Sequence, residues 1–559
     1  MSTINFKYSI LVLLVFTFFI NDIIGQDTLD VAPLNDEGEY NLVPTIWGDT
    51  TETGERANMN RVYRLQRGGI YIMDQTIYAD FPIRLVADSD DQSKRPPMLV
   101  RGKYTSGHNI KTFFTFTKDG LSHSFEDIIF NGVDVERLYY NQWNRGLKIS
   151  GDDIKVTLDR CIMSYWAGLF LEVTGDDASL IIRDSKWRNG VSAQAPPWGA
   201  QQNVFFTKYA DTIIFTNNTF FNTGGFCLDF ENPTIANYIK IEHNTFFTSS
   251  IDLLRMRDMV NTVFRSNLFY ATHSYGQSES ERKASWFDKD GEIISLFSID
   301  TTGVDLLNSV GLTEKDKNVV VSNNTFFFPQ KLKDWWEGFG GINTPVWMNN
   351  RTKAMFADDT NYPKLQDYDN DELDPGFVQS DMVDWVIGEL VTYNDRVRKK
   401  ASVVDLKYSR NYDTHTGTSD LLIGFPWPLP ESLVYNNQNM LTGGHDGLPI
   451  GDLNWFPDSR KEYGVGVDDI PNDLFRDIDC YPNPVTDIAN ITFDLLQSSK
   501  ISMKLLDING NLVKKLVEGV YTKGIHDIEL DVSKLNTGVY LYTITNGLSS
   551  KSKKLIIIK

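Results

Sequence analysis

The stretch "NNTFF" at residues 217–221 returns as "HNTFF" at 243–247, as "SNLFY" at 266–270 and as "NNTFF" at 323–327. The gaps between its asparagines are 26, 23 and 57 residues, so the first two approximate one period. The asparagine column contains Asn218, Asn244, Asn267 and Asn324, and weaker upstream copies put Ile128, Cys161 and Ser185 in it. A period in the twenties without helical periodicity is typical of a β-solenoid, in which each repeat forms one coil.

Identical residues in one column of a solenoid stack on each other in successive coils. We therefore expect the asparagines to hydrogen-bond along the axis at a sharp corner. The phenylalanines two residues later should stack in the core beside them. The motif has a structural role in this interpretation, and its asparagines have no catalytic one.

A second series of short strands is predicted about 13 residues before each asparagine, because apolar residues alternate there with the two-residue period of a strand. The series reads "LKIS" (147–150), "LEVT" (171–174), "VFFT" (204–207), "LDFE" (228–231) and "LRMR" (254–257). Alternation points Asp229 and Glu231 outward in one coil, and Arg255 and Arg257 outward in the next. Coils of parallel sheet lie about 4.8 Å apart, so Asp229 should neighbour Arg255 and Glu231 should neighbour Arg257. Lys148 and Glu172 should continue the first of these outward rows upstream.

The coil pattern over about residues 60–330 resembles the right-handed parallel β-helix of pectate-lyase-like proteins. The resemblance implies an all-β fold and says little about function. The stretch "NRVYRLQRGGIYIMDQTI" (60–77) resembles the usual N-terminal opening of such helices, which forms a cap. The stretches "DPGFV" (374–378) and "DGLPIGDLNWFP" (446–457) resemble segments that close them.

The C-terminal residues differ in character from the repeats. They contain "CYPNPVTDIANITFDL" from residue 480, a turn signal at "DING" and a lysine-rich end, with strand-like alternation between them. This combination resembles the type A sorting domain of cargo of the type IX secretion system of Bacteroidota, a small β-sandwich. The resemblance implies contact with that secretion machinery, export across both membranes, and a secreted or cell-surface location.

The chain ends, the net charge and the cysteine count restrict the possible location, partners and disulfides of the protein. Residues 1–25 have the layout of a secretory signal peptide, with an apolar run too short for a membrane span. A formal net charge of −20 argues against a nucleic-acid partner, but a local basic strip could still bind an anionic polysaccharide. Three cysteines are too few for a disulfide scaffold, so buried thiols are expected. We expect a monomer without a transmembrane span.

These observations predict a domain order. The expected segments are a signal peptide (1–25), an N-terminal segment and cap (26–120), the β-helix coils (121–330), a loop-rich closure (331–458), a linker (459–478) and the sorting domain (479–559).

The outward charged rows are the first candidate for chemistry. A lyase acting on a uronic acid needs a cation to offset the carboxylate and a base to take the C5 proton. Arg255 or Arg257 could supply the cation, and Lys148, Lys208 or His243 could supply the base. The plainer interpretation is that the charges form solvated cross-coil ion pairs, each worth well under ~1 kcal/mol. A glycosidase would instead use a carboxylate pair, and Asp229 with Glu231 is such a pair.

Further residues are candidates for binding. Glu172, Asp229 and Glu231 lie on the predicted face, and Trp335 and Trp336 in a glycine-rich loop could stack on sugar rings. Asp367, Asp369 and Asp371 alternate in "DYDNDELD" (367–374), as in an EF-hand, but Glu372 stands where that loop requires glycine. An EF-hand is therefore excluded. A loosely bound calcium ion is left open, and no other cofactor is expected.

The sequence thus predicts a secreted polysaccharide-active protein, foremost a polysaccharide lyase-like enzyme. Two alternatives stay open: a non-catalytic glycan-binding protein of a polysaccharide-utilisation system, and an adhesin. The polymer and the bond that is cleaved are not specified by the sequence.

Overall fold

A computed structural model provides the structure of this chain. It describes residues 27–35, 38–103, 106–135, 145–166, 168–190, 202–225, 227–230, 235–251, 254–256, 258–284, 292–309, 311–400, 411–418, 420–463, 475–495, 499–507, 512–522, 524–545 and 550–559. The predicted signal peptide, Glu231 and Arg257 lie outside the described residues.

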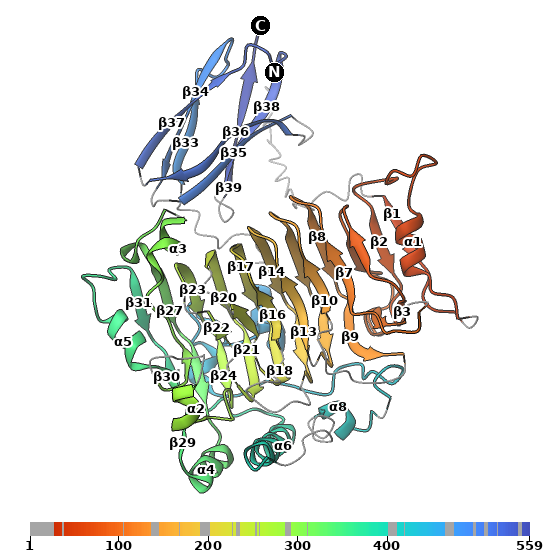
Figure 1. The fold of residues 1–559 in the computed structure, drawn as a ribbon, viewed down its shortest axis with the longest axis vertical. Coiled ribbons are helices and arrows are strands. Elements are labelled where there is room, and N and C mark those ends of the chain that lie inside the picture. Colours follow the sequence, from red (N-terminus) through yellow and green to blue (C-terminus); the bar gives the residue numbers. More distant parts are fainter. Residues whose placement is uncertain are drawn as a thin grey trace, which may run out of the picture.

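The described part of residues 28–372 is a solenoid of three parallel sheets, as Figure 1 shows. Each coil contributes one strand to each sheet in turn, so neighbours within a sheet are one coil apart in sequence. The three-sheet solenoid confirms the predicted parallel β-helix. The coils also begin before residue 121, because strands from Val62 onward already belong to these sheets.

Sheet 1 has eleven strands in the described residues: β1 (Thr28–Val31), β2 (Val62–Leu65), β5 (Arg84–Ala87), β8 (Ser122–Glu126), β11 (Lys155–Asp159), β14 (Ala178–Arg183), β17 (Ala210–Thr216), β20 (Ala236–Glu242), β23 (Asn261–Arg265), β27 (Asn318–Ser322) and β31 (Leu365–Tyr368). Sheet 2 has ten: β3 (Ile70–Met73), β6 (Met98–Arg101), β9 (Ile129–Asp134), β12 (Ile162–Ser164), β15 (Lys186–Arg188), β18 (Thr219–Thr223), β21 (Thr245–Ser249), β24 (Leu268–Tyr270), β28 (Thr325–Phe327) and β32 (Asp371–Glu372). Sheet 3 has seven: β4 (Ile77–Ala79), β7 (Thr112–Phe116), β10 (Arg145–Ile149), β13 (Leu169–Val173), β16 (Gln202–Phe206), β19 (Leu228–Phe230) and β22 (Leu254–Arg255).

The asparagine ladder is present at the corner between sheets 1 and 2. The Asn218 side-chain amide donates to Asn244 Oδ1 over 2.9 Å, and Asn244 donates to Asn267 Oδ1 over 3.0 Å. Asn267 donates in the same way to Asn324 over 2.9 Å. Each amide also donates to a main-chain carbonyl, so the ladder satisfies backbone groups that the corner takes out of the sheets.

The phenylalanines form the predicted core stack. Phe220 stacks on Phe246 with ring centroids 4.9 Å apart, and Phe246 stacks on Phe269 at 4.7 Å. Phe221 and Phe247 stack alongside at 5.3 Å. These rings are buried, and they belong to the main hydrophobic core of the solenoid. The repeat therefore specifies both the corner and the packing beside it.

The residue before each ladder position has a left-handed backbone, with φ between 52° and 57° from Asp127 to Asn323 in the described coils. The coils place Asp127, Arg160, Asp184, Asn217, His243, Ser266 and Asn323 there. Asparagine and aspartate tolerate this conformation best among the non-glycine residues, and histidine also enters it. His243 thus brings an imidazole to a corner position that the other described coils fill with aspartate, arginine, asparagine or serine.

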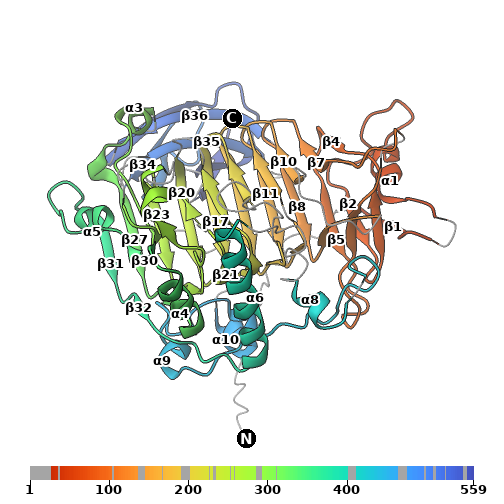
Figure 2. The same cartoon turned by 60° about the horizontal axis from the view of Figure 1, so that its bottom comes forward.

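The closure after residue 330 contains more helix than the loop-rich segment that we expected. Its longest helix is α6 (Ser380–Arg398), whose buried residues follow helical spacing from Met382 to Val397. The other helices in the described residues between 279 and 463 are α2 (Glu279–Ala284), α3 (Val304–Ser309), η1 (Glu314–Asp316), α4 (Gln330–Phe339), α5 (Asn350–Phe356), α8 (Tyr412–His415), α9 (Gln438–Leu441), η2 (Leu453–Trp455) and α10 (Pro457–Glu462). Two small sheets pair β25 (Gln277–Ser278) with β29 (Ile342–Asn343) and β26 (Ser295–Phe297) with β30 (Val346–Met348). Figure 2 shows α4 and α6 side by side against the solenoid.

The C-terminal part forms two antiparallel sheets with their own core. One sheet contains β33 (Phe475–Tyr481), β34 (Ile488–Leu495) and β37 (Gly524–Asp531). The other contains β35 (Ser499–Asp507), β36 (Leu512–Tyr521), β38 (Gly538–Thr545) and β39 (Ser550–Ile557). Their buried side chains form a hydrophobic cluster separate from that of the solenoid. The three cysteines are buried and form no disulfide.

Candidate functional site

The outward row on sheet 3 has the predicted register. Lys148 lies beside Glu172, Glu172 beside Phe205, Phe205 beside Asp229, and Asp229 beside Arg255. The period-two alternation is therefore confirmed at these positions, with Leu228 and Phe230 in the core and Asp229 on the other face. The second predicted row cannot be followed, because Glu231 and Arg257 lie outside the described residues.

The charges of this row are paired, and its carboxylates are buried rather than solvated. The Arg255 guanidinium donates to both carboxylate oxygens of Asp229, with Nη2 2.7 Å from Oδ2, and the Asp229 side chain is 0 % exposed. Glu172 accepts from Arg145 over 2.8 Å and lies 3.1 Å from Lys148 Nζ. Burial alone would raise the pKa of Glu172, but hydrogen bonds and charge from Arg145 and Lys148 lower it. The cations of this row are thus committed to carboxylates of neighbouring coils.

The remaining candidates from the sequence lie apart from this row. Lys208 is half exposed and pairs with Asp176 at 3.2 Å. Trp335 and Trp336 belong to helix α4 rather than to a glycine-rich loop. Trp336 is buried and donates from Nε1 to the Ser274 carbonyl oxygen over 2.9 Å, so it anchors α4 to the solenoid. Trp335 is partly buried and lies 3.4 Å from Asp395 of α6.

The acidic stretch at 367–371 is a further copy of the corner motif. Asp369 has the left-handed corner backbone, and Asn370 extends the ladder by accepting from the Asn324 amide over 2.8 Å. Asp367 and Asp371 belong to the strands on either side, β31 and β32. Asp367 accepts from the Asn370 amide over 2.7 Å. This explains the alternating aspartates structurally, and in the described residues these three do not form a metal-ligand group.

His243 lies at the corner between β20 and β21, whereas Arg255 lies on sheet 3. The segment 443–457, here called the strap, covers this corner across several coils. Asn323 donates to the Gly443 carbonyl over 3.1 Å, and the Gly451 amide donates to the Ser266 carbonyl over 2.8 Å. Further along, Asn454 donates to the Asn217 carbonyl over 3.0 Å. The strap therefore runs antiparallel to the order of the coils and is hydrogen-bonded to several successive corners.

Glycine allows the strap to come this close. A Cβ atom at Gly444 would lie 2.6 Å from the Leu448 carbonyl oxygen and 3.2 Å from His243 Cε1. Gly451 has φ of 93°, and a Cβ there would lie 2.6 Å from Thr245 Oγ1. Larger residues would lift the strap from the corner. The predicted closing segment thus has a second effect: it brings His445 and Asp446 to His243.

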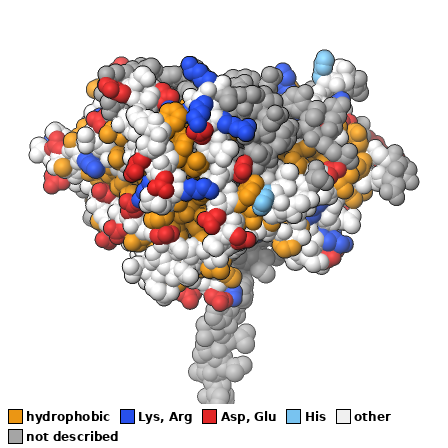
Figure 3. All heavy atoms as spheres, turned by 90° about the horizontal axis from the view of Figure 1, so that it is seen from below, with side chains coloured by type: hydrophobic (Ala, Val, Ile, Leu, Met, Phe, Trp, Pro, Cys, Tyr) orange, Lys and Arg blue, Asp and Glu red, His pale blue; other side chains and the backbone are white. Residues whose placement is uncertain are grey.

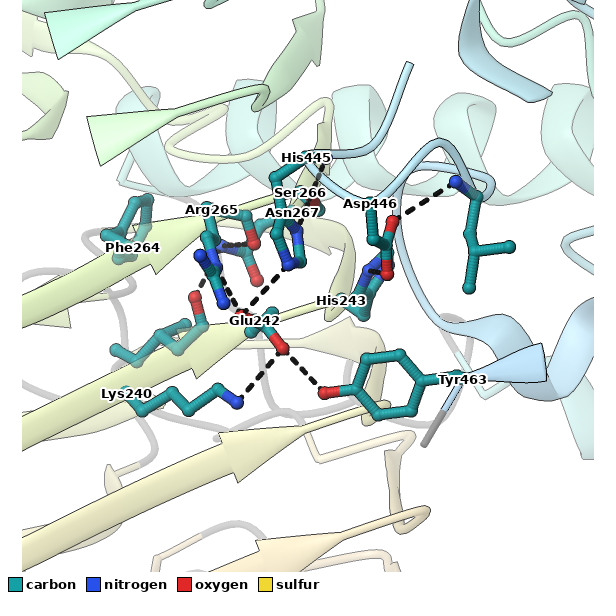
Figure 4. A network of polar contacts seen from close by, with 12 residues as sticks. Lys240, Glu242, His243, Phe264, Arg265, Ser266, Asn267, His445, Asp446 and Tyr463 are labelled. Atoms are coloured by element: carbon teal, nitrogen blue, oxygen red, sulfur yellow. Dashed lines mark hydrogen bonds and ion pairs between the residues drawn. The ribbon is translucent and has the colours of Figure 1, made fainter. Parts of the chain in front are cut away.

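A polar cluster results where the strap crosses β20 and β23, as Figure 4 shows. Glu242, at the end of β20, is 0 % exposed and forms its centre. It contacts Lys240 Nζ at 3.1 Å, accepts from Arg265, and accepts from the Tyr463 hydroxyl over 2.6 Å. Burial alone would raise the pKa of Glu242, but the charges of Lys240 and Arg265 lower it to about 2. Glu242 is therefore ionised at neutral pH.

Two imidazoles and a second carboxylate complete the cluster. His243 Nε2 lies 3.1 Å from Asp446 Oδ2, and its Nδ1 lies 3.3 Å from the Gly451 carbonyl oxygen. His445 Nδ1 lies 2.9 Å from Ser266 Oγ, and its Nε2 lies 3.7 Å from Glu242 Oε2. Burial is the largest influence on His445 and lowers its pKa to about 4, so its imidazole is neutral at neutral pH.

The cluster is partly open to solvent. The side chains of His445, Asp446 and Arg265 are 15 %, 24 % and 26 % exposed, whereas those of His243 and Glu242 are fully buried. Buried polar side chains with partly exposed ones beside them are the arrangement expected where a ligand meets preorganised polar groups. On the face drawn in Figure 3, acidic and basic side chains of the described residues alternate without a field of one sign. Recognition of an anionic polymer there would depend on a local group of cations.

Sequence reasoning found His243 but missed the rest of this cluster. His445 and Asp446 are about 200 residues away from His243 in the chain, and no local spacing connects them. The available signal was "GGHDG" at 443–447, where glycines surround two ligand-type residues. Glu242 and Arg265 carried a second signal, because both immediately precede the left-handed corner position in neighbouring coils.

Comparison with known proteins identifies the C-terminal part. Residues 479–558 match the family model described as "Secretion system C-terminal sorting domain". The C-terminal β-sandwich is a type IX secretion sorting domain. Through the sorting domain, this chain is cargo exported across the outer membrane, to be secreted or held at the surface. A search of curated proteins found no match. Among the described residues, no helix is long and apolar enough to cross a membrane.

Proposed function

We propose that this exported β-helix protein is a polysaccharide lyase-like enzyme that cleaves a uronic-acid polymer at the cluster around Glu242. The observation that carries the proposal is the convergence of Arg265, His445 and Tyr463 on one buried, ionised carboxylate at a partly open corner. This corner replaces the row on sheet 3 as the favoured site, because its polar groups are more varied and include groups that can transfer protons.

The group types match what β-elimination requires. The uronate carboxylate must be offset by positive charge, the C5 proton must be accepted, and the leaving oxygen must receive a proton. Arg265 is a partly exposed cation of the cluster, with 26 % of its side chain accessible to solvent. Two groups could move the protons: the neutral imidazole of His445 and the hydroxyl of Tyr463. Glu242 holds Arg265 and Tyr463 in place and acts as a positioning residue.

The test is to incubate the purified protein with a panel of uronic-acid polysaccharides and to follow the ultraviolet absorbance of unsaturated products. Tyr463→Phe removes one hydroxyl and should lower the rate about 10²–10³-fold, the scale for losing one transition-state hydrogen bond. Arg265→Ala should lower it at least as much.

Arg183→Ala is the matched control. Arg183 occupies the same column as Arg265 three coils earlier and pairs with Asp159 at 2.8 Å, so its replacement should leave the rate unchanged. Loss of activity in Arg255→Ala with full activity in Tyr463→Phe would move the site back to sheet 3. Binding without new chain ends would contradict a lyase and favour a glycan-binding protein. Binding to whole cells alone would favour an adhesin.

A further inference from the structure

The two histidines and Asp446 have an arrangement that the lyase proposal does not need. In the described residues, His243, His445 and Asp446 each offer a ligand atom, and these atoms all lie within 4.8 Å of one another. The three come from two distant segments, the β20–β21 corner and the strap. Such convergence of two imidazoles and one carboxylate is the ligand set of many transition-metal sites.

The hydrogen bonds of His243 orient it as metal ligands are oriented. A carbonyl oxygen only accepts, so Nδ1 of His243 donates to the Gly451 carbonyl and carries a hydrogen. Its Nε2 then faces Asp446 Oδ2 at 3.1 Å. A nitrogen lone pair and a carboxylate oxygen at this distance need a proton or a metal cation between them. An imidazole with Nδ1–H on a backbone carbonyl and Nε2 toward the metal is the common second-shell pattern.

His445 has an equivalent support. Its Nδ1 lies 2.9 Å from Ser266 Oγ, and the same hydroxyl oxygen accepts from the His445 main-chain amide over 2.9 Å. Nδ1–H can therefore donate to Ser266, which leaves Nε2 toward the interior of the cluster. Asp446 is oriented by the Leu448 amide, which donates to Oδ1 over 3.1 Å and leaves Oδ2 for a ligand.

The distances and ligand types restrict the ion. With metal–ligand bonds of about 2.0–2.1 Å, two atoms bound to one metal at about 90–110° are separated by about 2.8–3.4 Å. The 3.1 Å between His243 Nε2 and Asp446 Oδ2 lies in this range. Imidazole ligands disfavour calcium and magnesium, which take oxygen ligands. Glu242 is already held by Lys240, Arg265 and Tyr463, so it belongs to the surroundings of the site.

We propose that His243, His445 and Asp446 bind one divalent transition-metal ion, such as Zn²⁺, so that His445 is a ligand rather than a proton-transferring group, with at least one coordination position left open toward solvent. The partial exposure of Asp446 and His445 provides the entry path. The proposal deepens the proposed function, on which its catalytic meaning rests: a metal bound to His445 Nε2 would offset the uronate carboxylate and leave Tyr463 as the proton-transferring group. Metal binding itself can be measured without any polysaccharide.

The experiment titrates the metal-stripped full chain with Zn²⁺ by calorimetry and with Co²⁺ by visible absorption. We expect one equivalent to bind and Co²⁺ to show ligand-field bands. His445→Gln and Asp446→Asn should each weaken binding at least 10–100-fold, because each removes one ligand. Asp446→Asn keeps an oxygen for the Leu448 amide, so the strap should stay folded.

The control is Asp458→Asn, an exposed carboxylate on α10 near the strap, which should bind metal like the parent. The unfolding transition of each metal-free variant, compared with that of the metal-free parent, shows whether the variant is still folded. The proposal would be overturned if the parent bound no stoichiometric metal, or if Asp446→Asn and His445→Gln both bound metal as tightly as the parent. Metal binding without activity on any polysaccharide would leave this inference standing and would contradict the proposed function.

Discussion

Single residues at the corner determine what each coil contributes. The ladder asparagines repeat because each one satisfies main-chain groups of the coil beside it. The position before them is free to vary within the residues that tolerate a left-handed backbone. Asp184 and Asn217 at that position both accept from Asn454 of the strap, whereas His243 makes the position part of a polar cluster. A repetitive fold thus creates a candidate site at a position of the repeat where the residue type varies from coil to coil.

Asp452, in the strap, predicts a pH-dependent stability. It is buried and accepts from Thr219 Oγ1 over 2.6 Å and from the Asn454 amide over 2.9 Å. Burial is the largest influence and raises its pKa to about 6. The folded state therefore keeps a proton that the unfolded state loses near pH 4. The stabilisation from that proton is complete below the unfolded pKa and is lost as pH rises toward 6.

Asp452→Asn should remove this loss of stability with rising pH, because an asparagine side chain does not titrate. We expect the free energy of unfolding of the parent to fall relative to that of the variant by roughly 1–3 kcal/mol between about pH 4 and pH 6.5. Urea unfolding of both proteins across this range measures the difference. Parallel curves would contradict the assigned titration. Asp458→Asn, which changes an exposed carboxylate, should leave the curve of the parent unchanged.

At the scale of elements, sequence periodicity predicted the contacts between neighbouring coils but not the contacts between segments far apart in the chain. The coil period predicted the ladder, the phenylalanine stack and the pairing of Asp229 with Arg255. It did not reveal that "DYDND" is a corner, because an insertion with α4 and α5 separates Asn370 from Asn324. Nor could it show that His445 reaches His243, since that contact depends on where the strap crosses the coils. Glycines and hydrogen bonds of the strap determine the crossing, and these carry no fixed spacing.

One such distant connection joins β15 to the closure. Arg188 is buried and donates to both Asp413 and Glu431, with four nitrogen–oxygen distances between 2.5 and 2.8 Å. Arg188→Ala would leave two buried carboxylates without this cation. We expect a loss of roughly 3–5 kcal/mol in the free energy of unfolding, the scale for breaking a buried ion pair. Chemical denaturation measures it.

Arg183→Ala, five residues earlier, is the comparison. The Arg183 side chain is 40 % exposed, and Asp159 keeps Arg160 as a second partner, so the loss should be well under ~1 kcal/mol. Similar losses in the two variants would show that the buried network does not fasten the closure. The triple replacement of Arg188, Asp413 and Glu431 by apolar residues should recover part of the lost stability, because it leaves no unpaired buried charge.

At the scale of the whole molecule, two structural units carry two tasks. The solenoid holds the candidate site, and the sorting domain directs export. Their buried side chains form separate hydrophobic clusters, and the last element of the solenoid part, α10, ends at Glu462, while β33 begins at Phe475. A domain with its own core can fold by itself. The sorting domain and the solenoid that contains the candidate site are therefore expected to be separable.

This separation predicts independent unfolding. A chain that ends at Tyr463 keeps every residue of the polar cluster, so it should fold and retain any metal binding and polysaccharide cleavage of the full chain. Calorimetry of the full chain should show two transitions, and the smaller one should be absent from the shortened chain. The remaining midpoint should shift by no more than a few degrees, because the solenoid core loses none of its own side chains. A large fall of the midpoint in the shortened chain would show that the sorting domain stabilises the solenoid. A single transition in the full chain would show that the two parts unfold as one unit.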